Sequence, residues 1–271
     1  MEHKILGEIT HNTRTKTYPD GSQVVTVADR PIFREPGWEI ADQWEKGPRN
    51  LSKKLDRDGE AEDRERARRR ARAAVADLGR ANSFRYFVTL TLDQSRVDRY
   101  DDAITGKQLR RWLSHQVQRR GLVYVLVPER HKDGGLHFHG LFNDALELID
   151  SGTVKPPQGG KPRRPRSAAE RRAWLENGGQ IVYNIPGWGL GFSTALELKG
   201  DYRKAVAYVC KYIGKDSEKI GGRWYFSGGD LKRPEATYSD TDYDALRQEC
   251  EGHEYRIDRL GVRCMNIDME G

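Results

Sequence analysis

The chain has 271 residues, enough for one sizeable core with extensions or for two small domains, and its mean hydropathy of −0.84 implies that highly charged, solvated segments accompany that core. Lys and Arg outnumber Asp and Glu by 47 to 41, a net charge of +6 that gives only a modest bias toward polyanionic partners. Three cysteines without a CxxC pair argue against a disulfide framework or zinc knuckle, and the lack of a long apolar run or signal peptide predicts a soluble protein of the reducing cytoplasm.

The first 80 residues are expected to form an extension made of a small hairpin and a basic helix. Two alternating runs, residues 4–10 and 23–28, flank the turn-forming residues 18–21 (YPDG), which predicts the hairpin. Residues 52–78 are rich in Arg, Glu and Ala and lack an interior proline, which predicts a helix that ends at Gly79. The excess of charge leaves this helix little surface to bury.

Residues 81–235 are expected to form the core domain, followed by a C-terminal tail over residues 236–271. Runs of β-branched and aromatic residues predict strands, and apolar residues at helical spacing predict helices. The strands are expected at residues 84–92, 122–127, 135–142, 189–198 and 222–227, and the helices at residues 103–119 and 201–215. This mixed order, with a hairpin at 122–142, predicts an α+β fold in which helices cover a sheet.

Two histidines stand out in the predicted strand 135–142. In a strand, His137 and His139 point to one face while Phe138 points to the other, so both imidazoles can reach one metal ion. Glu129, at the end of the preceding strand, can supply an oxygen ligand across the hairpin, with His131 in the turn as a competing ligand. Such a half-filled site suits Mg²⁺ or Mn²⁺ acting on a phosphodiester. The histidine pair alone is explained equally well by two surface side chains.

Two tyrosines lie four residues apart in the predicted helix 201–215. This spacing places Tyr208 and Tyr212 on one face of the helix, so either phenol could be a nucleophile. A phenol with the ordinary pKa of about 10 reacts poorly at neutral pH, but Lys211 and a metal-bound phosphate could favour its ionised form. By itself, the pair is more often explained by aromatic packing in the core.

The order and content of three motifs resemble the HUH superfamily of rolling-circle replication initiators. The motifs are residues 87–91 (FVTLT), residues 136–142 (LHFHGLF) and residues 208–212 (YVCKY). Within that superfamily, the phage- and plasmid-type initiators of Gram-positive bacteria are the most similar, because their cores continue into segments like residues 221–227 (GGRWYFS) and 231–235 (LKRPE).

The resemblance implies a central antiparallel sheet of about five strands with an RRM-like arrangement, and a metal-dependent enzyme that nicks and joins single-stranded DNA at a replication origin in a bacterial host cell. Tyr208 matches the nucleophile that would form a 5′-phosphotyrosine, and Lys211 matches its lysine. Tyr212 is either a second catalytic tyrosine or a packed neighbour. No G-x-x-x-x-G-K-[ST] phosphate loop occurs, so a host helicase would separate the strands and a host DNA polymerase would extend the 3′ end.

Contacts to DNA are expected from basic clusters and one aromatic side chain. Residues 155–172 hold seven Lys or Arg against one acid and four prolines, which predicts a basic surface loop. The candidate DNA-binding residues are Arg68, Arg69 and Arg70 in the basic helix, Arg163, Arg164 and Arg166 in the loop, and Trp188 as a stacking surface. A solvated charged face or a buried tryptophan would explain these residues equally well.

Other functions share parts of this pattern. Relaxases place their tyrosine before the histidines, whereas here Tyr208 follows them, and small single-strand transposases lack the long flanking segments of this chain. A basic DNA-binding protein without catalysis is the alternative from a different class.

Overall fold

The computed structural model describes residues 10–34, 57–214, 218–249, 253–257 and 262–267. They belong to two compact units, one drawn from residues 61–232 and the other from both ends of the chain, residues 1–60 and 233–271. None of the helices in these described ranges is long and apolar enough to cross a membrane.

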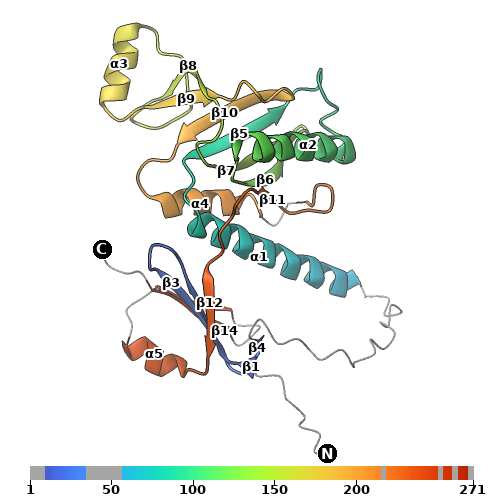
Figure 1. The fold of residues 1–271 in the computed structure, drawn as a ribbon, viewed down its shortest axis with the longest axis vertical. Helices are drawn as coiled ribbons and strands as arrows, with labels where there is room; N and C mark the ends of the chain where they lie inside the picture. Colours follow the sequence, from blue (N-terminus) through green and yellow to red (C-terminus); the bar gives the residue numbers. More distant parts are fainter. Residues whose placement is uncertain (1–9, 35–56, 215–217, 250–252, 258–261, 268–271) are drawn as a thin grey trace, which may run out of the picture. The chain divides into compact units, whose positions relative to one another are not determined.

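The larger unit is built on a seven-stranded antiparallel sheet with the order β11-β6-β7-β5-β10-β9-β8 (Figure 1). Its strands are β5 (Tyr86–Leu92), β6 (Tyr124–Arg130), β7 (Leu136–Phe142), β8 (Ile149–Lys155), β9 (Gln180–Asn184), β10 (Gly191–Glu197) and β11 (Phe226–Gly228). The predicted α+β class is confirmed. The sheet exceeds the expected five strands because β8 and β9, two short strands beside the basic loop, extend one edge.

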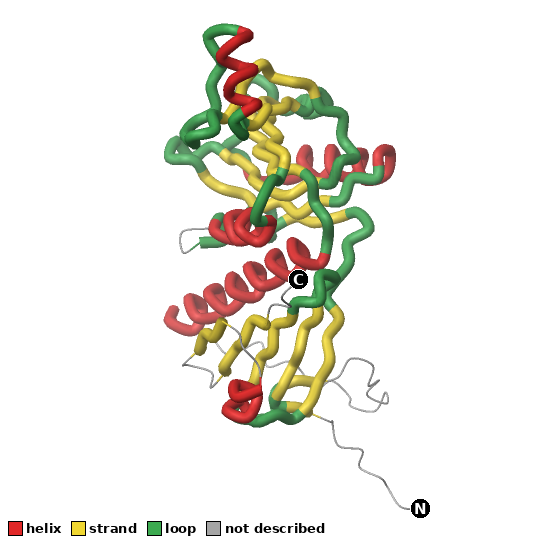
Figure 2. The backbone as a smooth tube through the Cα atoms, turned by 90° about the vertical axis from the view of Figure 1, so that its left-hand side faces the viewer, coloured by secondary structure: helices red, strands yellow, loops and turns green. Residues whose placement is uncertain are grey.

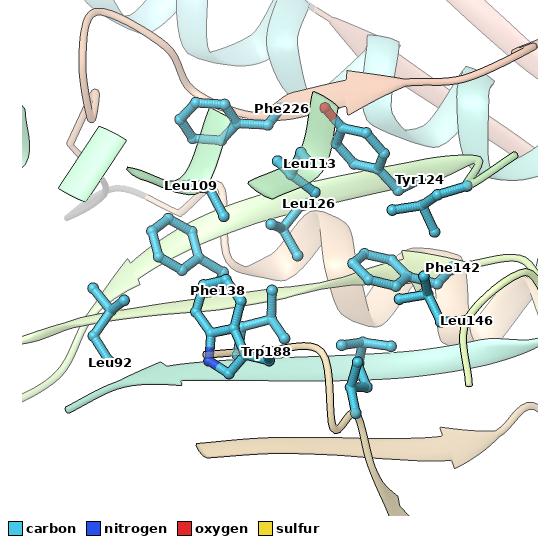
Figure 3. Close-up of a cluster of buried hydrophobic side chains, with 14 of the residues drawn as sticks. Leu92, Leu109, Leu113, Tyr124, Leu126, Phe138, Phe142, Leu146, Trp188 and Phe226 are labelled. Carbon is cyan, nitrogen blue, oxygen red and sulfur yellow. The ribbon is translucent and has the colours of Figure 1, made fainter. Parts of the chain in front are cut away.

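Helices cover both faces of this sheet. They are α1 (Arg57–Ala81), α2 (Asp102–Arg120), α3 (Ala168–Glu176) and α4 (Tyr202–Lys211). Leu109 and Leu113 of α2 pack with Phe138 and Phe142 in a core on one face, where all four side chains are almost fully buried (Figure 3). On the opposite face, α1 and α4 pack over β6 and β7. Alternation along β7 explains both cores, because Phe138 enters the first and Leu141 the second.

The helix α1 buries more surface than its composition suggests. Ala71, Val75 and Leu78, spaced four and three residues apart, are buried against α4 and the sheet. Gly79 does not end the helix as expected but lies inside it, because a Cβ atom there would come within 2.5 Å of Cγ1 of Val206 in α4. The expectation of an exposed helix was therefore wrong: the glycine allows two helices to approach closely.

The smaller unit is a five-stranded antiparallel sheet with the order β12-β2-β3-β14-β13 (Figure 2). It contains β2 (Thr13–Thr17), β3 (Gln23–Ala28), β12 (Glu235–Ser239), β13 (His253–Ile257), β14 (Val262–Ile267) and the helix α5 (Tyr243–Glu249), with β1 (Thr10–His11) and β4 (Phe33–Arg34) paired beside it. The predicted turn is present between β2 and β3, but the first hairpin strand is residues 13–17. Residues 4–9 of the expected strand lie outside the described residues. The expected extension and tail thus contribute strands to one sheet.

Gly79→Ala is expected to destabilise the protein by roughly 1–3 kcal/mol, because the stiff Val206 side chain cannot yield to the added methyl group. Urea unfolding measures the change. Gly106→Ala in α2 is the matched control: its Cβ would meet only the end of the flexible Arg110 side chain at 3.2 Å, so better helix propensity should stabilise the protein by up to about 1 kcal/mol. Equal stabilisation by both substitutions would contradict the close helix contact.

Candidate active site

Strand register brings the two histidines and the glutamate to one place on the sheet. His137 and His139 lie on β7, and Glu129 on β6 is paired directly with His137. Phe138 between the histidines is fully buried on the opposite face. The Oε2 atom of Glu129 lies 2.8 Å from Nε2 of His139. The predicted grouping of these three side chains therefore matches their placement in the structure.

Two threonines orient the imidazoles. Thr89 and Thr91 of β5 are paired with His139 and His137, and each hydroxyl lies 3.1 Å from Nδ1 of its histidine. With Nδ1 engaged, Nε2 is the nitrogen left to bind a ligand on each ring. Sequence analysis missed this role, although the alternation of residues 87–91 places both threonines on one face.

The helix α4 carries both tyrosines to the histidines. The Tyr212 ring stacks on the His139 ring with a centroid distance of 4.0 Å and an interplanar angle of 10°. Tyr208 packs against Phe87 at 5.4 Å, and the Tyr212 hydroxyl donates a hydrogen bond to the Tyr208 hydroxyl at 2.9 Å. Both predicted tyrosines therefore lie beside the predicted metal ligands, although they are far from them in the sequence.

These side chains line a single cavity of about 900 Å³. Its walls include the six residues expected at the centre of the site, namely Glu129, His137, His139, Tyr208, Lys211 and Tyr212. His131 also lines the cavity, with its ring 4.9 Å from that of His137. Lys161 reaches the cavity from the basic loop, which sequence analysis assigned only to the surface.

Burial sets the protonation states in this cavity. It lowers the pKa of His137, with a further contribution from nearby His131. It also lowers the pKa of His139, although the carboxylate of Glu129 opposes this shift. Burial raises the pKa of Tyr212, and the hydrogen bond to Tyr208 adds to the effect. At neutral pH the imidazoles are therefore neutral, as metal ligands must be, and Tyr212 keeps the proton that it donates.

The donor types fit a hard divalent cation, whereas their present positions do not surround one. Two imidazole nitrogens and one carboxylate suit Mn²⁺ or Mg²⁺ and leave positions for phosphate oxygens. No three His, Cys, Asp or Glu side chains within the described ranges converge closely enough to hold an ion, because Glu129 and His139 bond to each other directly. The Glu129 side chain is 42 % exposed, so it is free to turn and admit an ion between them.

The helix α1 fixes the position of α4. The Tyr202 hydroxyl at the start of α4 donates toward the carbonyl oxygens of Gly79 and Asn82, both at 2.8 Å, and burial raises its pKa to about 12. Near the other end, the buried Cys210 thiol donates to the Arg72 carbonyl oxygen at 3.8 Å. The predicted basic helix thus supports the element that carries the tyrosines.

The candidate DNA-binding residues differ in their surroundings. Arg68 pairs with Glu65 and its side chain is only 12 % exposed, whereas Arg69 and Arg70 are exposed. Arg163 lies over the Trp174 ring at 4.1 Å and pairs with Glu170. Arg164 and Arg166 lie in the same loop, with Arg164 exposed and Arg166 next to the N-cap of α3.

Trp188 is not available for base stacking. Its side chain is 3 % exposed and lies in the core of Figure 3, where it packs edge-on against Trp112 at 5.0 Å. The indole nitrogen donates to the Thr91 carbonyl oxygen at 3.2 Å. The sequence motif around it, rich in glycine and proline, looked like a surface loop, but the indole turns inward to close the core.

Comparisons with known proteins give one match. Residues 85–217 match the model of the replication-associated protein ORF2 family, a range that includes the whole cavity lining up to Gly214 and supports a role in the initiation of DNA replication. Searches of curated proteins and of solved structures gave no match.

In metal-free protein, both cavity imidazoles are expected to titrate below the ordinary histidine pKa of about 6.5. Glu129→Gln should lower the His139 midpoint further, because it removes the negative charge that favours the protonated ring. Nuclear magnetic resonance titration of the ring nitrogens measures both values. A His139 midpoint that rises in this variant would contradict the assigned contact.

Proposed function

We propose that residues 81–235 form a tyrosine endonuclease of the HUH type, which nicks and rejoins single-stranded DNA at a replication origin and initiates rolling-circle replication of a phage or plasmid. The observation that carries this proposal is the meeting of Tyr208 and Tyr212 with His137 and His139 in one open cavity. The family match over residues 85–217 supports the link to replication.

The reaction requires one nucleophile and one site that stabilises charge on the phosphate. His137, His139 and Glu129 would hold Mn²⁺ or Mg²⁺, which when bound polarises the scissile phosphodiester. The Tyr208 oxygen attacks phosphorus as its proton leaves to solvent, and the bond from phosphorus to the 3′ oxygen breaks. The 3′ oxygen takes up a proton, so the products are a 5′-phosphotyrosine and a free 3′-OH, from which a host polymerase can extend.

Tyr208 is the better first nucleophile of the two tyrosines. It is 49 % exposed, so DNA can reach it, whereas Tyr212 is half-buried between Tyr208 and His139. The hydrogen bond from Tyr212 stabilises negative charge on the Tyr208 oxygen, since a donor that retains its proton favours an ionised acceptor. Lys211 lines the same cavity and adds positive charge for the phosphate.

Strand rejoining reverses this chemistry. A 3′-OH attacks the phosphotyrosine, and the Tyr208 oxygen leaves and regains a proton. Tyr212 can take part as the proton donor to the departing oxygen, given its 2.9 Å hydrogen bond. Reciprocal attack by Tyr212 on a second strand would require this bond to break first.

Tyr208→Phe is expected to abolish a covalent protein–DNA adduct on single-stranded oligonucleotides that contain the origin, in the presence of Mn²⁺. Tyr212→Phe should retain the adduct but form it roughly 2- to 10-fold more slowly, because one hydrogen bond is lost. Denaturing gels and mass spectrometry of the modified peptide measure both effects, with Tyr238→Phe in β12 as the control. Adduct formation by Tyr208→Phe at the wild-type rate would assign the nucleophile elsewhere. DNA binding with no adduct from the wild type would favour a non-catalytic binding protein.

Thr91→Val is expected to weaken Mn²⁺ binding by about 10- to 100-fold, because the hydroxyl that orients His137 is removed while the volume is kept. Isothermal titration calorimetry measures the affinity. Thr194→Val on the exposed part of β10 is the matched control and should leave it unchanged. If chelation of the metal leaves cleavage unaltered, the assigned ligands are wrong.

A further inference from the structure

One large aromatic side chain on the sheet of the larger unit is open to solvent. Phe192 in β10 is 68 % exposed, the highest value among the exposed large hydrophobic residues in the described ranges. Its neighbours Ser193 and Ala195 point into the core, whereas Phe192 and Thr194 are exposed on the opposite face. A phenylalanine in the middle of a regular strand is normally covered, so this exposure needs an explanation.

Phe192 lies in the same row of the sheet as the candidate metal ligands. It is paired with Thr91, which is paired with His137, which is paired with Glu129. Residues directly opposite on neighbouring strands share a face, and strands lie about 4.8 Å apart. Phe192 is therefore two strand spacings, roughly 10 Å, from His137 along a continuous surface.

Positive charge borders the same face. Lys161 lines the cavity with His137 and His139, although it follows β8 at the far edge of the sheet, four strands from β7. The basic loop therefore reaches from that edge to the candidate active site. An aromatic surface beside cations is the combination that binds single-stranded nucleic acid, because bases stack on the ring while phosphates contact the charges.

We propose that Phe192 is a stacking platform for a base of the single-stranded DNA, positioned next to the phosphate that Tyr208 attacks. This inference rests on the proposed function and adds a binding subsite to it. The occupant is a base of any identity, since every base has a stacking face. Phe192 would thus hold the strand in place for cleavage, in the role that sequence analysis gave to Trp188.

The test measures DNA affinity without metal and without cleavage. In a Tyr208→Phe background with a chelator present, fluorescence anisotropy follows binding of a labelled mixed-sequence single strand of about 30 nucleotides, longer than the site of a typical single-strand-binding fold. Phe192→Ala should weaken binding by roughly 5- to 150-fold, whereas Phe192→Trp should retain it. Ile149→Ala, which shortens another exposed apolar side chain on the same sheet, is the matched control and should have no effect. Thermal unfolding confirms that each variant is folded, which Phe192 exposure favours.

Two results would overturn the inference. Unchanged affinity in Phe192→Ala would show that the ring binds no base, and an equal loss for duplex DNA would show that the contact is not stacking. A separate arm tests the proposed function: adduct formation by protein with Tyr208 intact. An adduct together with unchanged affinity in Phe192→Ala rejects the subsite alone. A loss of affinity in Phe192→Ala without an adduct from the wild type rejects the endonuclease while retaining the DNA-binding face.

Discussion

The backbone register of three neighbouring strands determines everything at this site. Because β6, β7 and β5 pair in their observed alignment, Glu129, His137 and Thr91 form one row of side chains on one face. A slip of one residue in either ladder would turn a member of this row to the opposite face, into the apolar core. The buried Phe138 resists such a slip, since it would then be forced toward water. Core packing on one face therefore holds the chemistry on the other.

The second requirement is a helix at the correct height above that row. Val206 and Val209 anchor α4 in the same apolar cluster as Val127 and Leu141 of the sheet, so the tyrosines project beside the histidines. The helix α1 supports α4 from another side through Gly79 and the Arg72 carbonyl oxygen. A helix whose sequence is dominated by arginine thus contributes to the site through three apolar residues and one glycine, and its charges are secondary.

Local periodicity accounts for what the sequence could predict. A period of two placed His137 and His139 together, and a period of 3.6 placed Tyr208 and Tyr212 together, so the candidate site was assembled correctly from separate motifs. Properties that depend on distant partners were not predictable. Trp188 and Phe192 are four residues apart, yet one is buried and the other open, because only the neighbouring strands and α2 decide which side chain is covered. The threonine contacts and the burial of α1 depend on tertiary packing in the same way.

The arrangement of the smaller unit has a consequence for the order in which the chain can fold during synthesis. Its strand β2 pairs with β12, and β3 pairs with β14, so the sheet joins residues from nearly opposite ends of the sequence. The intervening residues of the larger unit are continuous in sequence and emerge from the ribosome first as a complete set. The hairpin of β2 and β3 must therefore wait, with unpaired edges, until the rest has been made. A ribosome-bound chain stopped before residue 235 would contain the whole candidate active site but only part of this sheet.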